Sequence, residues 1–592
     1  MKLLYLALLP SACLAILLWP IPQHMETGEI QLLLDSSFYI SGPDNEYLQD
    51  AIDRYTQLIT RERWDPVPYE TTNITSNVSH NTLEVLRIEV EREDDELEFG
   101  VDESYILEVP NQRSAFLTSK TVWGALRGLE TFSQLVQSRP NQNDLTDDGD
   151  DENYDPEYDY DENDYDDNED ENEDLDFEGL YIPNTPIVIK DAPKYYHRGI
   201  MLDTARNFYP VFHWHITDSQ SFPLKLRHSP ELANQGAYKL HQKRLVYTRK
   251  DVQHVIEYAY RRGVRVIPEI DMPAHTGSWG LSHKDITTCT GLHYLDSTGD
   301  WGNRLAAEPT TGQLNPIKDK TYDIVNKVIK EVTSLFKDSW YHGGGDEPVY
   351  KCWEQDESVR QYMKEKNVTG VDLLGSFLEK ELDMIRDSKK TAILWEDAAT
   401  NDNLPIPKDV VLQVWTNPLH KAVKKGYKVI ASNYNFWYLD CGHGGWGGND
   451  TSYDEQEKPK INPEVSAILE KYELSDNYNT LNWGGPGGDW CSPYKSWQRV
   501  YSYDLEYNLT AKEAENVLGG ETALWSEQSD PVSLDNKLWP RAAAAAEVLW
   551  SGRYDYKHKR RSIGDAMGRM FDWRYRLVAR NINAVAIQPL WW

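Results

Sequence analysis

The spacing of hydrophobic and polar residues changes along the chain and divides it into two regions. Between Glu29 and Arg139, short β-rich runs (LLLDSSFYI, LEVLRIEVE and SYILEV) alternate with helical ones. The clearest helical run is WGALRGLETFSQLVQ, residues 123–137, whose apolar residues recur at mixed i, i+3 and i+4 spacing. This pattern predicts a small α+β domain, to which we assign residues 21–190.

After Lys194, short apolar strands alternate with amphipathic helices. The successive runs are GVRVIPEID, TYDIVNKVIKEVTSLF, DSWYHGGGDE, LLGSFLEKELDMIRDS, TAILWEDA, VVLQVW and YKVIASNY. Repeated β–α units whose strands end in polar and aromatic residues predict a parallel α/β barrel, which we place at residues 191–592. Barrels of this kind carry their chemistry at the C-terminal ends of the strands.

Two segments fall outside this pattern. Residues 1–20, MKLLYLALLPSACLAILLWP, combine Lys2 with a short apolar core interrupted by Pro10, which predicts a secretory signal peptide; a retained membrane anchor is the alternative. No further run of about 20 apolar residues follows, so we expect no stable membrane span. Residues 141–178 are acidic and of low complexity, and we expect a disordered insertion there.

The charge of the chain limits its partners. A formal net charge of −35 argues against nucleic acid or an anionic membrane surface as a partner. Much of this charge is local, because residues 144–178 hold 21 of the 96 acidic residues and contain neither Lys nor Arg. The acidity is therefore mainly a property of one segment.

The cysteines and glycosylation sequons fit an exported protein. Cys13 lies in the signal peptide, and the other four cysteines are widely spaced without a C-x-x-C motif, which favours two disulfides over a zinc site. Three pairings of four cysteines are open at this point. Asn-x-Ser/Thr sequons occur at Asn73, Asn77, Asn367, Asn449 and Asn508.

The sharpest chemical feature is the sequence YHGGGDE at residues 341–347. Three glycines after a strand let the backbone turn tightly and approach a ligand. Adjacent side chains on a strand point to opposite faces, so Asp346 and Glu347 can serve one site only where the strand ends. Taken alone, the pair is more typical of a solvated acidic turn.

Aromatic residues at later strand ends favour a binding site instead. Trp395, Trp415 and Trp525 each end a strand-like run, in LWED, QVWTN and ALWSE. A single tryptophan is usually part of a core, but three on one barrel rim would form a cage for an apolar sugar face or an acetamido methyl group. Tyr438 and Asp440, in WYLDCG, add a hydroxyl and a carboxylate.

Seven motifs, in order along the chain, resemble those of family 20 glycoside hydrolases. They are HRGIMLDTARN, FHWHITDSQSFP, PEIDMPAHTGSWG, GQLNP, HGGGDE, WYLDCG and ALWSEQ, and the likeness extends from about Pro183 to the C-terminus. YLDCGHGGW, WCSPYKSWQRVY and WPRAAAAAEVLWSG resemble the secreted fungal branch of β-N-acetylhexosaminidases. The resemblance implies a (β/α)8 TIM barrel after a small α+β domain. It also implies an enzyme that needs no cofactor and removes terminal N-acetylhexosamine from chitooligosaccharides or glycoconjugates.

The same resemblance implies a retaining, substrate-assisted mechanism, in which the acetamido oxygen of the substrate is the nucleophile. Glu347 would protonate the leaving oxygen and then activate water. Asp346 would accept a hydrogen bond from the acetamido N–H, and Tyr438 would donate one to the acetamido oxygen. His275, in DMPAHT, resembles the histidine that the family places near the acid, although a lone histidine at a strand end is as often structural.

For sugar binding, the resemblance implies that Arg198, Asp440 and Glu527 hold the hydroxyl groups. Four tryptophans would wall the pocket: Trp395, Trp415, Trp490 and Trp525.

The resemblance also implies the disulfides Cys289–Cys352 and Cys441–Cys491, and it implies no metal site. One rival interpretation is a metal-dependent amidohydrolase, because the sequence H-W-H at 213–215 is like the H-x-H zinc pair of that class. No later His–His–Asp set completes such a site.

The first helix of the barrel departs from the family pattern. Family members place about 20 residues between the RNF-Y-P and FHWH motifs, whereas here residues 206–211 run directly into 212–215. A bridge of about six residues can span roughly 20 Å, although parallel strands normally need a crossover of a dozen or more residues. We therefore expect a barrel that closes without its first helix and leaves on the order of several hundred Å² of apolar strand surface open.

A mis-spliced gene or a damaged paralogue would produce this gap. A catalytically impaired homologue that binds glycans without turnover is accordingly the alternative to an active enzyme. We expect a secreted protein, in the medium or the cell wall, whose partners are N-acetylhexosamine-terminated oligosaccharides. The sequence does not decide between GlcNAc and GalNAc, between chitin fragments and N-glycans, or between a monomer and a homodimer.

Overall fold

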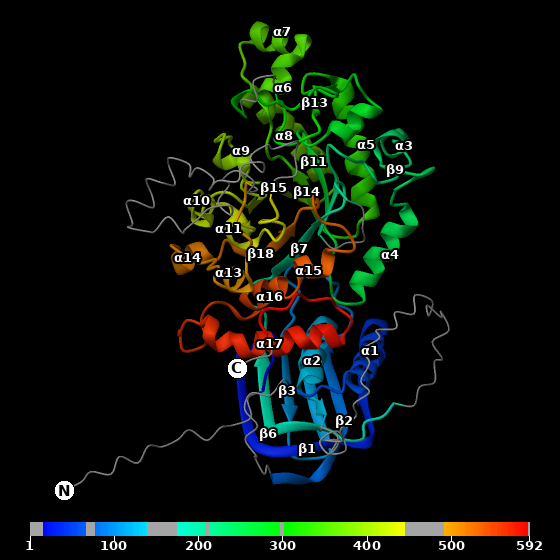
Figure 1. The fold of residues 1–592 in the computed structure, drawn as a ribbon, viewed down its shortest axis with the longest axis vertical. Helices are drawn as coiled ribbons and strands as arrows, with labels where there is room; N and C mark the ends of the chain where they lie inside the picture. The colour runs from blue at the N-terminus through cyan, green and yellow to red at the C-terminus, as the bar shows by residue number, and fades with distance from the viewer. Residues whose placement is uncertain are drawn as a thin grey trace, which may run out of the picture.

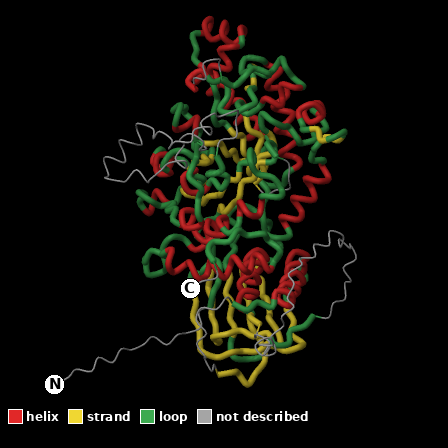
Figure 2. Tube along the Cα trace, in the orientation of Figure 1, coloured by secondary structure: helices red, strands yellow, loops and turns green. Residues whose placement is uncertain are grey.

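The computed structural model describes residues 16–66, 77–138, 175–207, 213–295, 301–444 and 490–589. Two units are stacked along the long axis of the molecule: a β-sheet domain lies at one end, and a barrel ringed by helices lies above it (Figure 1). Figure 2 shows strands gathered inside the upper unit and forming the sheet of the lower one. Of the expected acidic insertion, residues 141–174 lie outside the described residues.

The N-terminal domain is a six-stranded sheet that packs against two helices. The strand order is β1-β2-β4-β3-β6-β5, and β1 also pairs with β6. Buried and exposed residues alternate along β3 and β4, as expected for strands with one face on a core. The apolar residues of the strands and helices form one hydrophobic cluster. The elements are β1 (His24–Ser41), α1 (Glu46–Glu62), β2 (Asn77–Arg92), β3 (Tyr105–Val109), β4 (Ser114–Thr121), α2 (Val122–Leu135), β5 (Gln137–Ser138) and β6 (Leu180–Asp191).

Eight parallel strands close the barrel of the second domain, which confirms the predicted fold class. Their order around the barrel is β7-β8-β11-β14-β15-β16-β17-β18, and β18 pairs back onto β7. Apolar side chains of Ile267, Trp340, Ile393, Val411 and Ile430 form a separate cluster near the N-terminal ends of the strands. The strands are β7 (His197–Asp203), β8 (His213–Thr217), β11 (Pro268–Met272), β14 (Trp340–Gly344), β15 (Thr391–Trp395), β16 (Val411–Val414), β17 (Lys428–Ala431) and β18 (Val517–Leu524).

Helices and short strands connect and surround the barrel strands. Helix α8 shows how the sequence fixes them: the side chain of Thr369 caps its first turn through a capping box with Asp372, and its apolar face is buried. The helices are α3 (Pro230–Gly236), α4 (Arg249–Tyr260), α5 (Asp319–Leu335), α6 (Tyr350–Gln355), α7 (Glu357–Lys366), α8 (Gly370–Asp387), α9 (Asp397–Thr400), α10 (Leu419–Lys424), α11 (Tyr434–Trp437), α13 (Trp497–Tyr501), α14 (Ala511–Ala514), α15 (Leu534–Leu538), α16 (Arg541–Ser551) and α17 (Ile563–Ala579). The short strands are β9 (Lys239–Leu240), β10 (Lys243–Arg244), β12 (Thr287–Thr288) and β13 (Gln313–Leu314).

Helix α17 joins the two domains. It lies across the top of the N-terminal domain in Figure 1. Arg576 and Arg580 each form an ion pair with Glu62, at 2.9 and 3.2 Å, and Trp64 donates a hydrogen bond to Asp572 at 3.1 Å. These buried contacts hold the barrel in a fixed position on the first domain.

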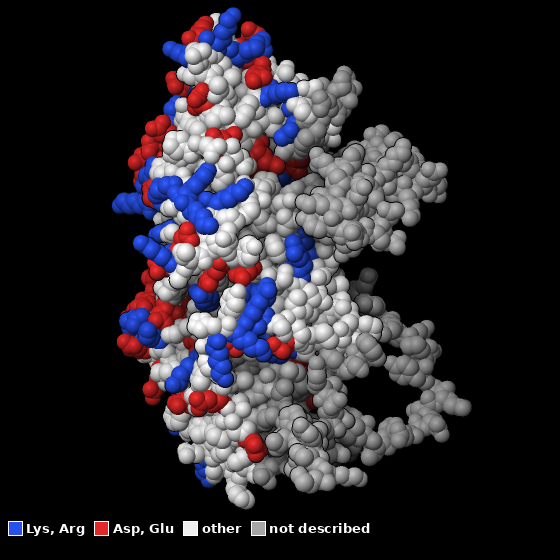
Figure 3. Space-filling model, turned by 90° about the vertical axis from the view of Figure 1, so that its left-hand side faces the viewer, with Lys and Arg blue, Asp and Glu red and all other residues white. Residues whose placement is uncertain are grey.

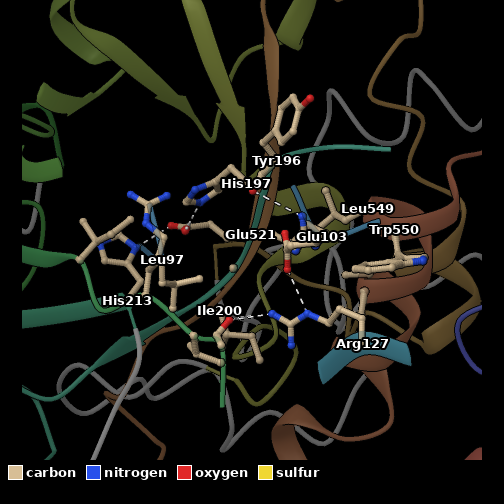
Figure 4. Close-up of a pocket in the computed structure, with 18 of the residues that line it drawn as sticks. Leu97, Glu103, Arg127, Tyr196, His197, Ile200, His213, Glu521, Leu549 and Trp550 are labelled. Atoms are coloured by element: carbon tan, nitrogen blue, oxygen red, sulfur yellow. Dashed lines mark hydrogen bonds and ion pairs between the residues drawn. The ribbon is translucent and has the colours of Figure 1, made fainter. Parts of the chain in front are cut away.

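The barrel closes, and the described residues between its first two strands contain no helix, as the sequence predicts. Strands β7 and β8 pair in parallel, with Met201 opposite His213 and Asp203 opposite His215. Ile200, on the outer face of β7, lines a cavity of about 490 Å³. Helix α16 and the residues that follow α4 flank this cavity on the barrel side, and the N-terminal domain borders it from below (Figure 4). The place of the missing helix is therefore partly hollow.

Trp19, which falls within the signal peptide expected at residues 1–20, packs against both domains. Trp19 is buried, and its indole N–H donates a hydrogen bond to the carbonyl of Ala543 at 2.9 Å. Its backbone N–H donates to Gln134 at 2.8 Å, and the guanidinium of Arg569 lies over its ring. Cleavage after residue 20 would remove Leu18 and Trp19 from two hydrophobic clusters, so these residues belong to the folded domain.

Two of the five expected glycosylation sites have an exposed asparagine. Asn367 and Asn508 are exposed, Asn77 begins β2, and Asn73 and Asn449 lie outside the described residues. Lys and Arg side chains are interspersed with Asp and Glu on the face shown in Figure 3. Within the described part of the chain, no helix is both long enough and apolar enough to cross a membrane.

Candidate active site

A tight turn at the end of β14 brings Asp346 and Glu347 out of the strand. Gly344 and Gly345 have φ angles of 75° and 97°. A Cβ atom at Gly344 would lie 1.8 Å from Oδ1 of Asp271, so only glycine fits there. Glu347 has a φ of 49°, which is uncommon for a residue with a side chain. The turn removes the strand geometry that would send the two carboxyl groups to opposite faces.

A histidine holds the carboxyl group of Glu347. Nε2 of His275 lies 3.4 Å from Oε2 of Glu347, and its Nδ1 lies 3.2 Å from Oδ1 of Asp218. Burial opposes a charge on His275, but the carboxylate of Asp218 and the contact with Glu347 raise the pKa of the imidazole well above its usual range. Burial likewise opposes a charge on Asp218, but Arg206 and His275 hold its pKa well below the usual range. An imidazolium thus lies between two carboxyl groups and fixes the direction of Glu347.

Asp346 is a buried acceptor with a free oxygen. Only 7% of the residue is exposed, and its Oδ1 has no hydrogen-bond partner among the described residues. Burial, and then the nearby carboxyl group of Asp271, raise the pKa of Asp346 well above its usual range. Burial also raises the pKa of Asp271, to about 7. A ligand with an N–H group or a positive charge at this place would remove the cost of burying Asp346.

Aromatic side chains from three strand ends, from the residue that follows α11 and from one loop meet beside the acidic pair. The ring centroids of Trp395 and Trp525 are 5.9 Å apart, and Tyr438 lies 6.1 Å from Trp525. Tyr438 stacks on Trp415 at 6.1 Å with an interplanar angle of 6°. Trp490 stands edge-on to both and is 61% exposed, so it forms the outer wall. The structure therefore brings together all the aromatic residues that the sequence singled out.

Hydrogen bonds to two buried carboxyl groups fix the orientation of two tryptophans of this aromatic cage. The indole N–H of Trp395 donates to Oε1 of Glu269 at 2.8 Å, and that of Trp415 donates to Oδ2 of Asp397 at 2.7 Å. Burial raises the pKa of Tyr438 well above its usual range, so its hydroxyl group stays protonated and can donate.

Two further carboxyl groups lie at the rim. The backbone N–H of Trp525 donates to Oδ1 of Asp440 at 3.4 Å. Oε1 of Glu527 lies 3.6 Å from Nε of Arg206. Burial raises the pKa of Glu527 to about 8, although Arg206 opposes the shift.

The structure contains both disulfides that the resemblance implies. Cys289 pairs with Cys352 and Cys441 pairs with Cys491, with Cα–Cα distances of 5.6 and 5.4 Å. The second bridge follows Asp440 directly and ties it to the segment that carries the outermost tryptophan.

Comparison with known proteins identifies this arrangement. The model of the family "Glycosyl hydrolase family 20, catalytic domain" matches residues 210–553, and that of "beta-acetyl hexosaminidase like" domains matches residues 18–135. The chain belongs to glycosyl hydrolase family 20. Beta-hexosaminidase 1 of Coccidioides posadasii is 35% identical over 100% of this chain and 97% of its own length. Beta-hexosaminidase subunit beta of Homo sapiens is 32% identical over 97% of this chain and 88% of its own.

Solved family 20 structures share the fold. The chitobiase of Flavobacterium johnsoniae superposes with a TM-score of 0.67 at 22% identity, covering 96% of this chain and 73% of that one. The N-acetyl-beta-hexosaminidase of Streptomyces plicatus, in complex with Thio-NAglucal, gives a TM-score of 0.63 at 20% identity, with 98% of both chains covered.

Arg198 does not belong to the family 20 site, and here the sequence-based prediction is wrong. Arg198 lies at the N-terminal end of β7, whereas the acidic pair lies at the C-terminal end of the barrel. Its guanidinium donates to Glu103 at 2.5 Å and to the carbonyl of Tyr195 at 2.6 Å, and lies over the ring of Trp550 at 5.1 Å. Alternation along the strand turns this side chain away from the barrel interior.

Arg206, which the sequence analysis missed, lies where Arg198 was expected. It follows the C-terminal end of β7 and contacts four carboxylates: Asp203 at 2.9 Å, Asp218 at 3.1 Å, Glu527 at 3.6 Å and Glu308. The four carboxylates outweigh the effect of burial and raise the pKa of Arg206 well above its usual range. The signal that could have found it is its position three residues after a strand end in HRGIMLDTARN.

The H-W-H sequence, which suggested a metal-dependent amidohydrolase, has a different role. His213 and His215 point into the barrel and contact the carboxylates of Glu521 at 2.7 Å and Asp218 at 3.0 Å. Membership of family 20 excludes the amidohydrolase class.

Proposed function

We propose that the protein removes terminal, non-reducing N-acetylhexosamine residues from glycans by a retaining, substrate-assisted mechanism. The observation that carries this proposal is the pairing of Asp346 with Glu347. One carboxyl group is buried and has a free acceptor oxygen, and the other is accessible and held by His275. These are the two environments that an amide-orienting group and a proton donor need.

In the first step, the acetamido oxygen of the substrate attacks the anomeric carbon and the glycosidic C–O bond breaks. Glu347 gives its proton to the departing oxygen. The attack forms a cyclic oxazolinium ion, so no enzyme carboxylate has to act as nucleophile. In the second step, water attacks the anomeric carbon, Glu347 takes a proton from that water, and the ring reopens. Two inversions give net retention of configuration.

Asp346 and Tyr438 orient the nucleophile. Asp346 accepts the acetamido N–H, and its carboxylate faces the positive charge that develops on the oxazolinium ring. Burial raises the pKa of Asp346, and the cationic intermediate offsets that penalty most in the transition state. The Tyr438 hydroxyl group donates to the acetamido oxygen.

The rim recognises the sugar. Asp440, Glu527 and Arg206 offer acceptors and donors to the hydroxyl groups, and the tryptophan cage contacts the apolar sugar face and the acetamido methyl group. Beta-hexosaminidases and a Chitooligosaccharidolytic beta-N-acetylglucosaminidase of Bombyx mori (31% identity over 97% of this chain) support chitooligosaccharides and glycoconjugates as substrates. The two disulfides and the exposed sequons Asn367 and Asn508 support secretion to the medium or cell wall.

The test compares a chromogenic N-acetylglucosaminide with the matching glucoside, which lacks the acetamido group. We expect the glucoside to be essentially inert, and a thiazoline mimic of the oxazolinium ion to bind far more tightly than the product. Asp346→Asn should lower kcat strongly on the N-acetylglucosaminide. Equal hydrolysis of both glycosides would contradict substrate assistance, and tight glycan binding without turnover would favour an inactive homologue.

A further inference from the structure

Alternating imidazoles and carboxylates extend from the candidate site down the inside of the barrel. We call this series the axial column; its members are His197, Glu521, His213, Glu269, His215, Asp218 and His275. Successive contacts measure 2.9, 2.7, 3.6, 2.9, 3.0 and 3.2 Å, and the last imidazole lies 3.4 Å from Glu347. Each member of the column is at most 9% exposed.

Burying a column of charged groups inside the barrel is energetically unfavourable. The interior of a TIM barrel is usually filled with branched apolar residues, as the cluster near the N-terminal ends of these strands is. Burying ionised groups carries a large desolvation penalty that close partners only partly offset. His213 and His215 on β8, Glu269 on β11 and Glu521 on β18 all contribute to this polar layer.

The members of the column hold one another in the ionised state. Burial opposes each charge, but His342 and His215 lower the pKa of Glu269 to about 2. Glu269 and the hydrogen bond to Asp218 raise the pKa of His215 well above its usual range. In the same way, Glu521 raises the pKa of His213. Positive and negative charges therefore alternate from Glu521 to His275.

Other titratable groups lie next to the column and contribute to the electrostatic potential along it. His342 on β14 lies 3.2 Å from Glu269, but burial lowers its pKa to about 4, so it adds no positive charge at neutral pH. Further ionisable groups around the upper end include Asp203, Arg206, Asp271, Glu308, Asp346, Asp397 and Glu527.

The lower end of the column borders the cavity left beside β7. His197, His213 and Glu521 line that cavity, and Figure 4 shows the two imidazoles directed at the carboxylate of Glu521. The column thus connects a hollow region at one end of the barrel with the proton donor at the other.

We propose that His215 and Glu269 are positioning residues that set the ionisation of Glu347 through Asp218 and His275. Neither residue touches Glu347, and the column of contacts connects each of them to it. Removing the positive charge of His215 leaves the column more negative, which makes Glu347 hold its proton more tightly. Removing the negative charge of Glu269 has the opposite effect. This inference rests on the proposed role of Glu347 as the acid.

The test is the pH profile of kcat/KM on chitobiose, whose poor leaving group needs the proton. The basic limb of this profile reports loss of the proton from the acid of the free enzyme. We expect His215→Gln to move that limb to higher pH and Glu269→Gln to move it to lower pH, each by about 0.5–1 pH unit. KM should change little, because Gln at 269 keeps an acceptor for the indole N–H of Trp395.

A matched control is Glu381→Gln on α8. Glu381 is also fully buried, but it packs outside the barrel against Gly343 and is not a member of the column, and burial raises its pKa well above the usual range. This variant should leave the basic limb in place. If His215→Gln fails to fold, His213→Gln, at the next imidazole down the column, should shift the limb in the same direction by less.

Two outcomes separate the inference from the mechanism on which it rests. If Glu347→Gln turns over chitobiose normally, the proposed acid is wrong. If Glu347→Gln is impaired but the His215 and Glu269 variants shift the limb in one common direction, or not at all, the column has only a structural role and the inference is overturned.

Discussion

Nε of Arg206 lies 3.6 Å from Oε1 of Glu527, at the C-terminal end of the barrel and beside the ring of Trp525. The guanidinium joins the ends of β7 and β18, which are neighbouring strands in the closed barrel. This placement allows Arg206 to contact a sugar hydroxyl group bound beside Trp525 and Glu527.

We therefore expect Arg206→Lys to lower kcat/KM by about 10- to 100-fold, since one charge-assisted hydrogen bond contributes about 1.5–3 kcal/mol. Arg198→Lys is the matched control at the other end of the same strand. It should change kcat/KM by less than about threefold while lowering Tm, because it weakens the contact with Glu103. Steady-state kinetics on a chromogenic N-acetylglucosaminide and a thermal melt distinguish the two. A larger kinetic loss at Arg198 would reverse the assignment.

A second prediction concerns the proton donor. Glu347→Gln should cost at least roughly 100-fold in kcat on chitobiose, because loss of a general acid typically costs 10²–10⁴-fold. An activated aryl leaving group needs less protonation, so its cleavage step should suffer less. Comparing single turnovers on the two substrates measures this difference. Equal losses on both would indicate damage to the site rather than loss of an acid.

The contrast between Arg198 and Arg206 shows which parts of the candidate site could be predicted from the sequence and which could not. The strand-end rule could place Trp395, Trp415 and Trp525, because each ends or directly follows an apolar strand, β15, β16 or β18. Both arginines lie in one motif, and the extent of β7 separates them: Arg198 lies at its N-terminal end and Arg206 lies three residues after its C-terminal end.

The axial column could not be predicted for a related reason. A strand of period two has two faces, and the sequence does not say which face of β8 points into the barrel. Contacts between His213 and Glu521 also span 308 residues, so only the closed barrel brings them together. Trp19 likewise becomes a core residue through Ala543, 524 residues away.

Acid stability should depend on Glu269. Its pKa falls from an ordinary 4.5 to about 2 in the folded protein. A carboxyl group whose folded pKa is lowered contributes stability above its unfolded pKa, and that contribution is lost as the pH falls through the folded value. The free energy of unfolding of the wild type should therefore drop between about pH 4.5 and 2 by a few kcal/mol relative to Glu269→Gln. Urea unfolding at several pH values measures this slope. Parallel pH dependences of the two proteins would contradict the prediction.

The gap between β7 and β8 leads to the last prediction. Ile200, Val264, Ala542 and Leu549 line the cavity of about 490 Å³ where a barrel helix would pack. Each large apolar side chain left uncovered forfeits about 1.5–3 kcal/mol, against a total stability of roughly 5–15 kcal/mol. The chain should therefore be prone to aggregation as it stands. Inserting an amphipathic helix of about 20 residues between positions 211 and 212 should raise Tm and soluble yield, because its apolar face would fill the cavity.

A Gly/Ser-rich insertion of equal length is the control, since it lengthens the short connection without covering the strands. If both insertions act alike, connection length rather than the exposed face limits stability. If the unmodified chain is soluble, unfolds in one step and is not stabilised by the helix, the gap is a tolerated form of the barrel and not a defect.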